Sequence, residues 1–256
     1  MKKATFIFQG DLPSFLPLHH RTGIYIARFQ GRQSVKHLIE SAGIPHTEVI
    51  RVKVNQKPVS MNYIVEDSDS VEVTPSNETG DLDSIQEANA LDSDLTSSNR
   101  FILDNHLGRL AGYLRLLGFD CLYDHRLEDI ALAELACLEH RILLTRDRRL
   151  LMRKIITSGY CVRSLIPEEQ VVEVLERFKL TNRIQPFRRC LRCNALLEPI
   201  DKEAILERLQ PLTRQYFNEF HRCINCDQIY WKGSHYEKME KFIEGVMEEE
   251  QKGASF

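Results

Sequence analysis

The sequence has no long apolar run and no glycine-rich phosphate loop. None of its apolar stretches comes near the ~20 residues that a membrane-spanning helix needs, so we expect no membrane partner. The first apolar run, after Lys2 and Lys3, stops within a few residues, so we expect no signal peptide. Neither G-x-x-x-x-G-K-[S/T] nor a credible G-x-G-x-x-G is present. These absences argue against a nucleotide-driven motor and against a dehydrogenase.

Aromatic and basic residues are both missing from residues 77–99, which carry six acidic residues. Such a composition is typical of a flexible linker, so we expect it to divide the chain of 256 residues. The net charge of −3 hides an uneven distribution, because residues 100–189 hold 16 basic and 12 acidic residues. This mildly basic part permits phosphate binding without requiring it.

The seven cysteines include two Cys-x-x-Cys pairs separated by 29 residues. Two such turns docked face to face form a tetrahedral thiolate site for structural Zn²⁺, and the spacing suits a zinc ribbon with an insertion. The predicted ligands are Cys190, Cys193, Cys223 and Cys226. The alternatives are four unrelated thiols or two disulfides. The remaining Cys121, Cys137 and Cys161 lie in apolar runs and are expected in the core. A reducing cytoplasm is the expected location.

Residues 1–76 follow the order β-β-α-β-β. The predicted strands are residues 4–9, 24–29, 49–54 and 71–74, and the helix follows Ser34 and ends near Glu40. This order matches a β-grasp, ubiquitin-like domain.

After the linker, short apolar strands alternate with amphipathic helices. The expected strands are residues 101–103, 121–123, 142–145 and 160–162, and the main helices are residues 107–117, 129–139 and 168–178. Repeated βα units predict a parallel sheet with helices on both faces.

Acidic residues follow two of these strands. Asp104 and Asp147 come directly after them, at the sheet edge where ligands bind in such folds, and Asp129 opens a helix from the same edge. Three close carboxylates suit Mg²⁺ or Mn²⁺, which can activate water against a phosphodiester. Asp120 and Asp124 are possible replacements for Asp129. The alternative for all three is simple helix capping.

Basic residues lie near these acids and near the second cysteine pair. Arg109, Arg115 and Arg146 could contact substrate phosphates. The segment after Cys226 mixes Tyr230 and Trp231 with Lys232 and His235, as a platform for single-stranded RNA would. Alternatively, Tyr230 and Trp231 pack behind the zinc site.

Four motifs, in order, cover almost all of residues 100–239: FILDNHLGRLAGYLRLLGFDCLYD, EHRILLTRDRRLL, PFRRCLRCNALLEPI and EFHRCINCDQIYWKGSHYEKM. They closely resemble the Mut-seven C-terminal RNase family, described as a PIN-like nuclease domain followed by a zinc ribbon. The resemblance implies acidic site positions at Asp104, Asp129 and Asp147, and zinc ligands at the four paired cysteines.

The segment SVKHLIESAGIPHTEVIRVKVNQKPV resembles the ubiquitin-like domain that precedes this nuclease in bacterial members. Sulfur-carrier relatives of that fold act through a free C-terminal Gly-Gly. Here the domain continues into TPSNETGDLD, without Gly-Gly, which favours a docking module with a protein partner.

The sequence thus predicts a multi-domain α/β protein. The expected parts are a β-grasp domain (1–76), an acidic linker (77–99), a PIN-like nuclease domain with a parallel α/β/α sheet (100–184), a zinc ribbon (185–242) and an acidic tail (243–256). The expected function is metal-dependent RNA hydrolysis. The alternatives are a non-catalytic RNA- or protein-binding adaptor and a factor associated with sulfur-carrier or ubiquitin-like chemistry.

Overall fold

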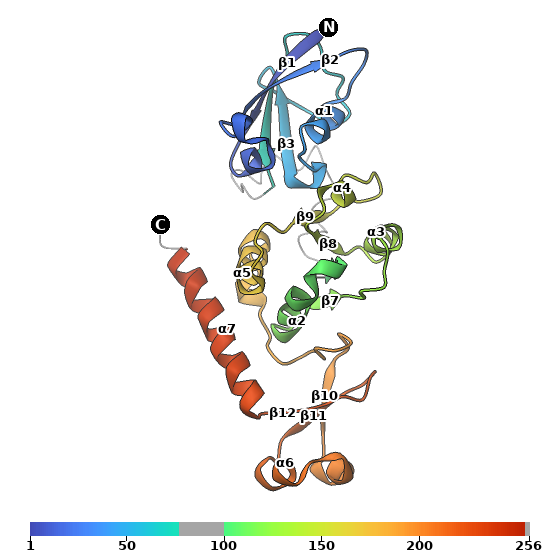
Figure 1. Cartoon of the computed structure of the whole chain (residues 1–256), viewed down its shortest axis with the longest axis vertical. Helices are drawn as coiled ribbons and strands as arrows, with labels where there is room; N and C mark the ends of the chain where they lie inside the picture. The colour runs from blue at the N-terminus through green and yellow to red at the C-terminus, as the bar shows by residue number, and fades with distance from the viewer. Residues whose placement is uncertain (77–99, 254–256) are drawn as a thin grey trace. The chain divides into compact units, whose positions relative to one another are not determined.

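The computed structural model describes residues 1–76 and 100–253 (Figure 1). The predicted linker, residues 77–99, lies outside the described residues. Contacts divide the chain into two compact units. One holds Met1–Ser98 with Leu127–Cys161, and the other holds Asn99–Arg126 with Val162–Phe256.

The N-terminal part is a five-stranded mixed sheet in the order β2-β1-β5-β3-β4. Alternation in β1 buries Ala4, Phe6 and Phe8 on one face, and Ser34 caps α1 by accepting a hydrogen bond from the amide of His37. The prediction of a ubiquitin-like β-grasp fold is confirmed. Its elements are β1 (Lys2–Phe8), η1 (Leu12–Phe15), η2 (Leu18–His20), β2 (Ile24–Phe29), α1 (Val35–Ser41), η3 (His46–Glu48), β3 (Val49–Val54), β4 (Lys57–Val59) and β5 (Ser70–Pro75).

The central part is a four-stranded sheet in the order β7-β6-β8-β9. The pairs β6–β7 and β8–β9 are parallel, and the apolar side chains of β6 and β8 are buried without alternation, as strands covered on both faces require. The predicted parallel α/β sheet is confirmed. Its elements are β6 (Arg100–Leu103), η5 (Asn105–Leu107), α2 (Gly108–Leu116), β7 (Asp120–Leu122), α3 (Asp129–Leu138), β8 (Ile142–Thr145), α4 (Arg148–Leu151), β9 (Gly159–Cys161), α5 (Pro167–Phe178) and η6 (Thr181–Arg183).

A small antiparallel sheet, β10-β11-β12, follows. The insertion between the cysteine pairs forms η7 and α6 and shares a small core with β12, made of Ile205, Leu209, Phe220 and Ile229. The elements are β10 (Leu197–Ile200), η7 (Lys202–Arg208), α6 (Pro211–Tyr216), β11 (Phe220–Cys223) and β12 (Ile229–Trp231).

The chain then continues into the long helix α7 (Ser234–Gly253), which lies beside α5 (Figure 1). The Phe242 ring stacks on Tyr113 of α2 with a centroid distance of 4.4 Å, and Ile243 is buried. One helix therefore crosses the boundary that the sequence placed at residue 242. The many acidic residues of this helix make its apolar packing residues, such as Phe242 and Ile243, difficult to recognise in the sequence.

Two glycines of the α2 region are expected to respond oppositely to alanine. In Gly112→Ala the added Cβ meets nothing within 4 Å, and the substitution should stabilise the fold by about 0.5–1 kcal/mol because alanine is the better helix former. In Gly118→Ala the Cβ would lie 2.2 Å from the Gln185 carbonyl oxygen, at φ +95°, so the fold should be clearly destabilised. Urea unfolding of both variants measures the two effects. A destabilised Gly112→Ala protein would contradict the open surroundings of that position.

Candidate metal centre and predicted catalytic acids

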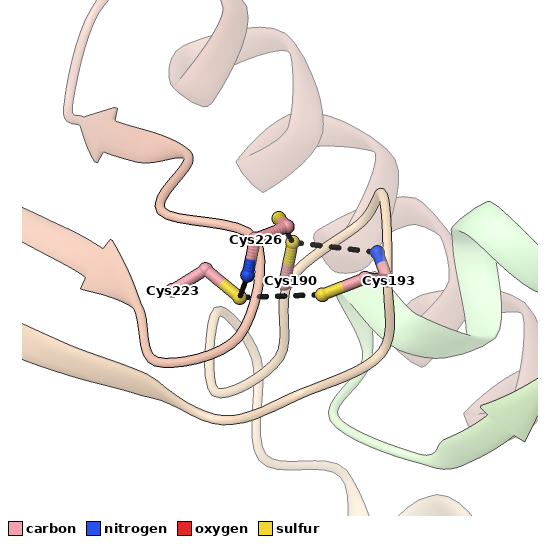
Figure 2. A group of neighbouring side chains, drawn as sticks. All are labelled: Cys190, Cys193, Cys223 and Cys226. Carbon is pink, nitrogen blue, oxygen red and sulfur yellow. Dashed lines mark hydrogen bonds between the residues drawn. The ribbon is translucent and has the colours of Figure 1, made fainter.

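The four paired cysteines converge at the tips of two loops (Figure 2). Their sulfur atoms all lie within 4.8 Å of one another, with Cys190 and Cys226 3.5 Å apart and Cys193 and Cys223 3.3 Å apart. These distances exceed a disulfide bond of roughly 2.05 Å, and all seven cysteines are free thiols. Among the described residues, this cluster is the one group of three or more His, Cys, Asp or Glu side chains that lie close enough together to hold a metal ion.

The backbone of each loop supports the same geometry. The amide of Cys193 donates to Cys190 Sγ over 3.5 Å, and the amide of Cys226 donates to Cys223 Sγ over 3.4 Å (Figure 2). The residue after each second cysteine, Asn194 or Asp227, has a positive φ that turns the chain back. Two equivalent turns thus present four sulfur atoms to one point, which matches the tetrahedral sulfur site that Zn²⁺ prefers.

Burial changes the ionisation of one thiol in the cluster. Desolvation raises the pKa of the Cys226 thiol to about 12. A thiol with this pKa stays protonated at neutral pH unless a metal displaces its proton. Because a thiol must lose its proton to ligate a metal, metal binding at this cluster would release protons, and acidification would oppose it.

Side chains of the nuclease part hold the first cysteine loop. Asn194 Nδ2 donates to Asp120 Oδ1 over 2.8 Å, and Asn194 Oδ1 accepts from the amide of Cys121 over 2.9 Å. Asp120 also pairs with Arg189 at 3.6 Å and with Arg100 at 3.7 Å. Asp120 therefore has a structural role here. In the sequence, only the asparagine directly after the second cysteine of the pair points to this contact.

Arg115 lies at the same junction and is only 4% exposed. Its Nε donates to the Cys121 carbonyl oxygen, and its Nη1 donates to the carbonyl oxygens of Leu191 and Arg192. A buried guanidinium with these bonds supports the cysteine loop and is not placed to contact substrate phosphates. The helical period of α2 agrees with this burial, since Arg115 lies four residues after the buried Ala111 and shares its face.

Tyr230 packs against the metal site, as the alternative interpretation of that segment expected. Its hydroxyl lies 3.2 Å from Cys190 Sγ and accepts from the amide of Leu191 over 3.1 Å. Trp231 differs, since it remains 39% exposed and lies 6.4 Å from Phe220, centroid to centroid. Cys137 also differs from expectation: it is exposed on α3, whereas Cys121 and Cys161 are buried. The apolar neighbours of Cys137 gave no indication of which helix face it occupies.

Asp104 follows β6 directly and is 6% exposed. It occupies the N-cap position of η5 but makes no capping hydrogen bond with its side chain, and the residue takes part in other interactions. Helix capping therefore does not account for this buried acid.

Asp147 and Asp129 differ from Asp104 in exposure and in contacts. Asp147 is exposed and caps α4, since its Oδ1 accepts from the amide of Arg149 over 2.8 Å. Asp129 is the first residue of α3, behind the N-cap Glu128, and its half-exposed carboxylate lies 3.9 Å from Arg153 Nη2. The possible replacement Asp124 is bound to Arg126 through two hydrogen bonds of 2.9 Å and 2.7 Å.

The predicted RNA-contacting residues Arg109 and Arg146 are both exposed. Arg109 lies near Tyr113 and Glu168, where the Tyr113 hydrogen bond, with a smaller contribution from Arg109, lowers the pKa of Glu168. Lys232 is exposed and pairs with Glu219 over 3.1 Å, which raises its pKa. His235 lies in α7, and its side chain is outside the description.

A parallel α/β domain bound to a four-cysteine ribbon, with a ubiquitin-like domain before it, defines the class of this protein. The family model of the Mut7-C RNAse domain matches residues 99–243, and the Mut7-C ubiquitin model matches residues 1–81. The chain belongs to the Mut7-C RNAse domain family, which supports a ribonuclease. No curated protein matches the chain significantly, and neither does any solved structure. In the described part of the chain, no helix has the length and apolar character to cross a bilayer.

Proposed function

We propose that this protein is a Mg²⁺- or Mn²⁺-dependent ribonuclease whose Asp104, Asp129 and Asp147 hold the ion. The match of the Mut7-C RNAse domain over residues 99–243 carries the proposal. Asp104 directly follows β6 and Asp147 lies two residues after the end of β8, at the strand ends where parallel α/β sheets bind ligands, which adds support. A bound divalent ion would supply a hydroxide nucleophile and offset charge on the phosphodiester.

Basic residues supply substrate contacts in this proposal. Arg109 and Arg146, both exposed, orient phosphates, and Lys232 and His235 hold single-stranded RNA on the ribbon. Zn²⁺ on the four cysteines keeps the ribbon folded. Seven free cysteines suit a reducing cytoplasm.

The proposal is tested with chelator-treated protein and end-labelled RNA and DNA. We expect cleavage of single-stranded RNA with Mn²⁺ or Mg²⁺ and none with EDTA, at chelator levels that leave the zinc bound. Zinc content is measured on the same samples, so that loss of the ribbon is not mistaken for loss of catalysis. RNA that stays intact with both metals, in zinc-loaded protein, would contradict the proposal.

One observation favours the adaptor alternative. Asp147 already has a structural role, because its carboxylate caps α4 by accepting a hydrogen bond from the amide of Arg149. An adaptor would bind RNA without cutting it, and binding would not depend on Mn²⁺ or Mg²⁺. The cleavage experiment, with a binding measurement beside it, separates the two functions.

A further inference from the structure

The β-grasp domain contacts one segment of the nuclease domain, which starts at Arg148, directly after Asp147, and runs through α4 to β9. Arg148 Nη1 donates to the Phe15 carbonyl oxygen over 2.8 Å. His46 Nε2 lies 2.9 Å from the Ile156 carbonyl oxygen, and the amide of Cys161 donates to Glu48 Oε1 over 2.7 Å. Because all of these residues belong to the same compact unit, the three contacts form one interface.

The contact at α4 combines two interactions. Besides its hydrogen bond, the Arg148 guanidinium lies over the Phe15 ring, 4.8 Å from the centroid. Gly43, at φ +97°, borders the same place, since a Cβ there would lie 3.9 Å from Arg148 Nη1. Cation–π contact and a charge-assisted hydrogen bond together fix the position of the guanidinium.

The contacts at the other end of the segment are polar and shielded. Glu48 is 2% exposed, and its carboxylate binds an amide of the edge strand β9. His46 has acceptors at both ring nitrogens, Glu40 Oε1 at 2.8 Å and the Ile156 carbonyl oxygen at 2.9 Å. These contacts anchor the segment beyond α4, at Ile156 and at Cys161 of β9.

We infer that the β-grasp domain acts within its own chain as a brace for the Asp147 turn, with Phe15 and Arg148 as positioning residues. The helix α4 has four residues, so it holds little structure by itself. Asp147 binds the amide of Arg149, and the intervening Arg148 is clamped to Phe15, so the clamp restricts the orientation of the Asp147 carboxylate. The catalytic part of this inference rests on the proposed function, whereas the bracing itself does not.

The test uses the full chain and the variants Arg148→Ala, Phe15→Leu and their combination. Arg148→Lys keeps the charge and serves as the conservative rescue. Arg149→Ala is the matched control, because it removes a neighbouring exposed arginine while its amide still binds Asp147. Hydrogen exchange of residues 147–152 is measured first, followed by the Mn²⁺ dependence of RNA cleavage and the KM for RNA.

We expect faster exchange of residues 147–152 in Arg148→Ala and Phe15→Leu, little further change in the double variant, and no change in Arg149→Ala. The Mn²⁺ concentration for half-maximal cleavage should rise about tenfold, which corresponds to about 1.4 kcal/mol, at an unchanged KM for RNA. Arg148→Lys should recover part of both effects.

Unchanged exchange in Arg148→Ala and Phe15→Leu would overturn the brace. A raised KM for RNA in Arg148→Ala, with unchanged Mn²⁺ dependence, would make Arg148 a phosphate contact instead. If the unmodified chain does not cut RNA, the proposed function fails, and the exchange measurement still decides on the brace.

Discussion

Replacing Asp104 and Asp147 together by asparagine is expected to lower the rate of RNA cleavage by about 10³-fold. Metal ions supply several kcal/mol of charge stabilisation in such reactions, and ~4 kcal/mol corresponds to about 10³-fold. Asparagine keeps the size of the side chain but loses the negative charge that binds the ion. It also caps helices as well as aspartate does, so α4 should keep its cap on the Arg149 amide. The measurement is single-turnover cleavage of end-labelled RNA in saturating Mn²⁺.

A matched control neutralises two exposed acids of the ribbon insertion, as Asp201→Asn/Glu203→Gln. This control should cut RNA at the unmodified rate, and RNA affinity should be equal in all three proteins. Asp129→Asn alone should have a smaller effect than the Asp104/Asp147 pair, because its carboxylate is half-exposed and lies near Arg153. If Asp104→Asn/Asp147→Asn cut RNA at the unmodified rate, the assignment of both acids as metal ligands would be wrong, and their roles would be structural.

Replacing Cys223 by serine is expected to abolish zinc binding and to unfold the ribbon. Structural Zn²⁺ contributes ~10–16 kcal/mol of apparent binding free energy in small zinc domains, far more than the four-residue core of the ribbon can supply. We expect the zinc content of the purified protein to fall to the background, and residues 197–231 to become sensitive to protease. The damage should extend to α2 and β7, since Arg115 and Asn194 tie the first cysteine loop to them.

Cys137→Ser is the appropriate control for that experiment. Cys137 is an exposed cysteine of α3 outside the metal cluster, so its replacement should leave zinc content and protease resistance unchanged. Retained zinc and an intact ribbon in Cys223→Ser would mean that the four sulfur atoms do not form a structural zinc site.

Local patterns were sufficient to predict much of the fold. Alternation in β1, the apolar β6 and β8, and the Ser34 cap are short-range signals, and they led to the β-grasp and parallel-sheet parts that the structure shows. The four cysteine ligands could also be predicted from the sequence, because the two members of each pair lie within one turn. The helix α7 was not predicted, because the composition of residues 243–256 is that of an acidic tail.

Contacts between distant segments explain what the sequence did not reveal about the site. Arg115 resembled a phosphate-binding residue, and only its position against the carbonyls of Leu191 and Arg192 shows its supporting role. Phe15, His46 and Glu48 carried no signal of their own, because their partners lie more than a hundred residues away. The expectation of a partner for the β-grasp domain did not consider the chain's own nuclease domain.

The binding of Glu48 to the edge strand β9 has a consequence for how the chain behaves as it folds. An open strand edge offers free amides to any other extended chain, which is a route to misassembly and aggregation. The Glu48 carboxylate occupies one of these amides, that of Cys161, and η3 lies against the strand. The β-grasp domain therefore also blocks further strand pairing at β9. A nuclease domain synthesised without it would expose this edge strand to other extended chains.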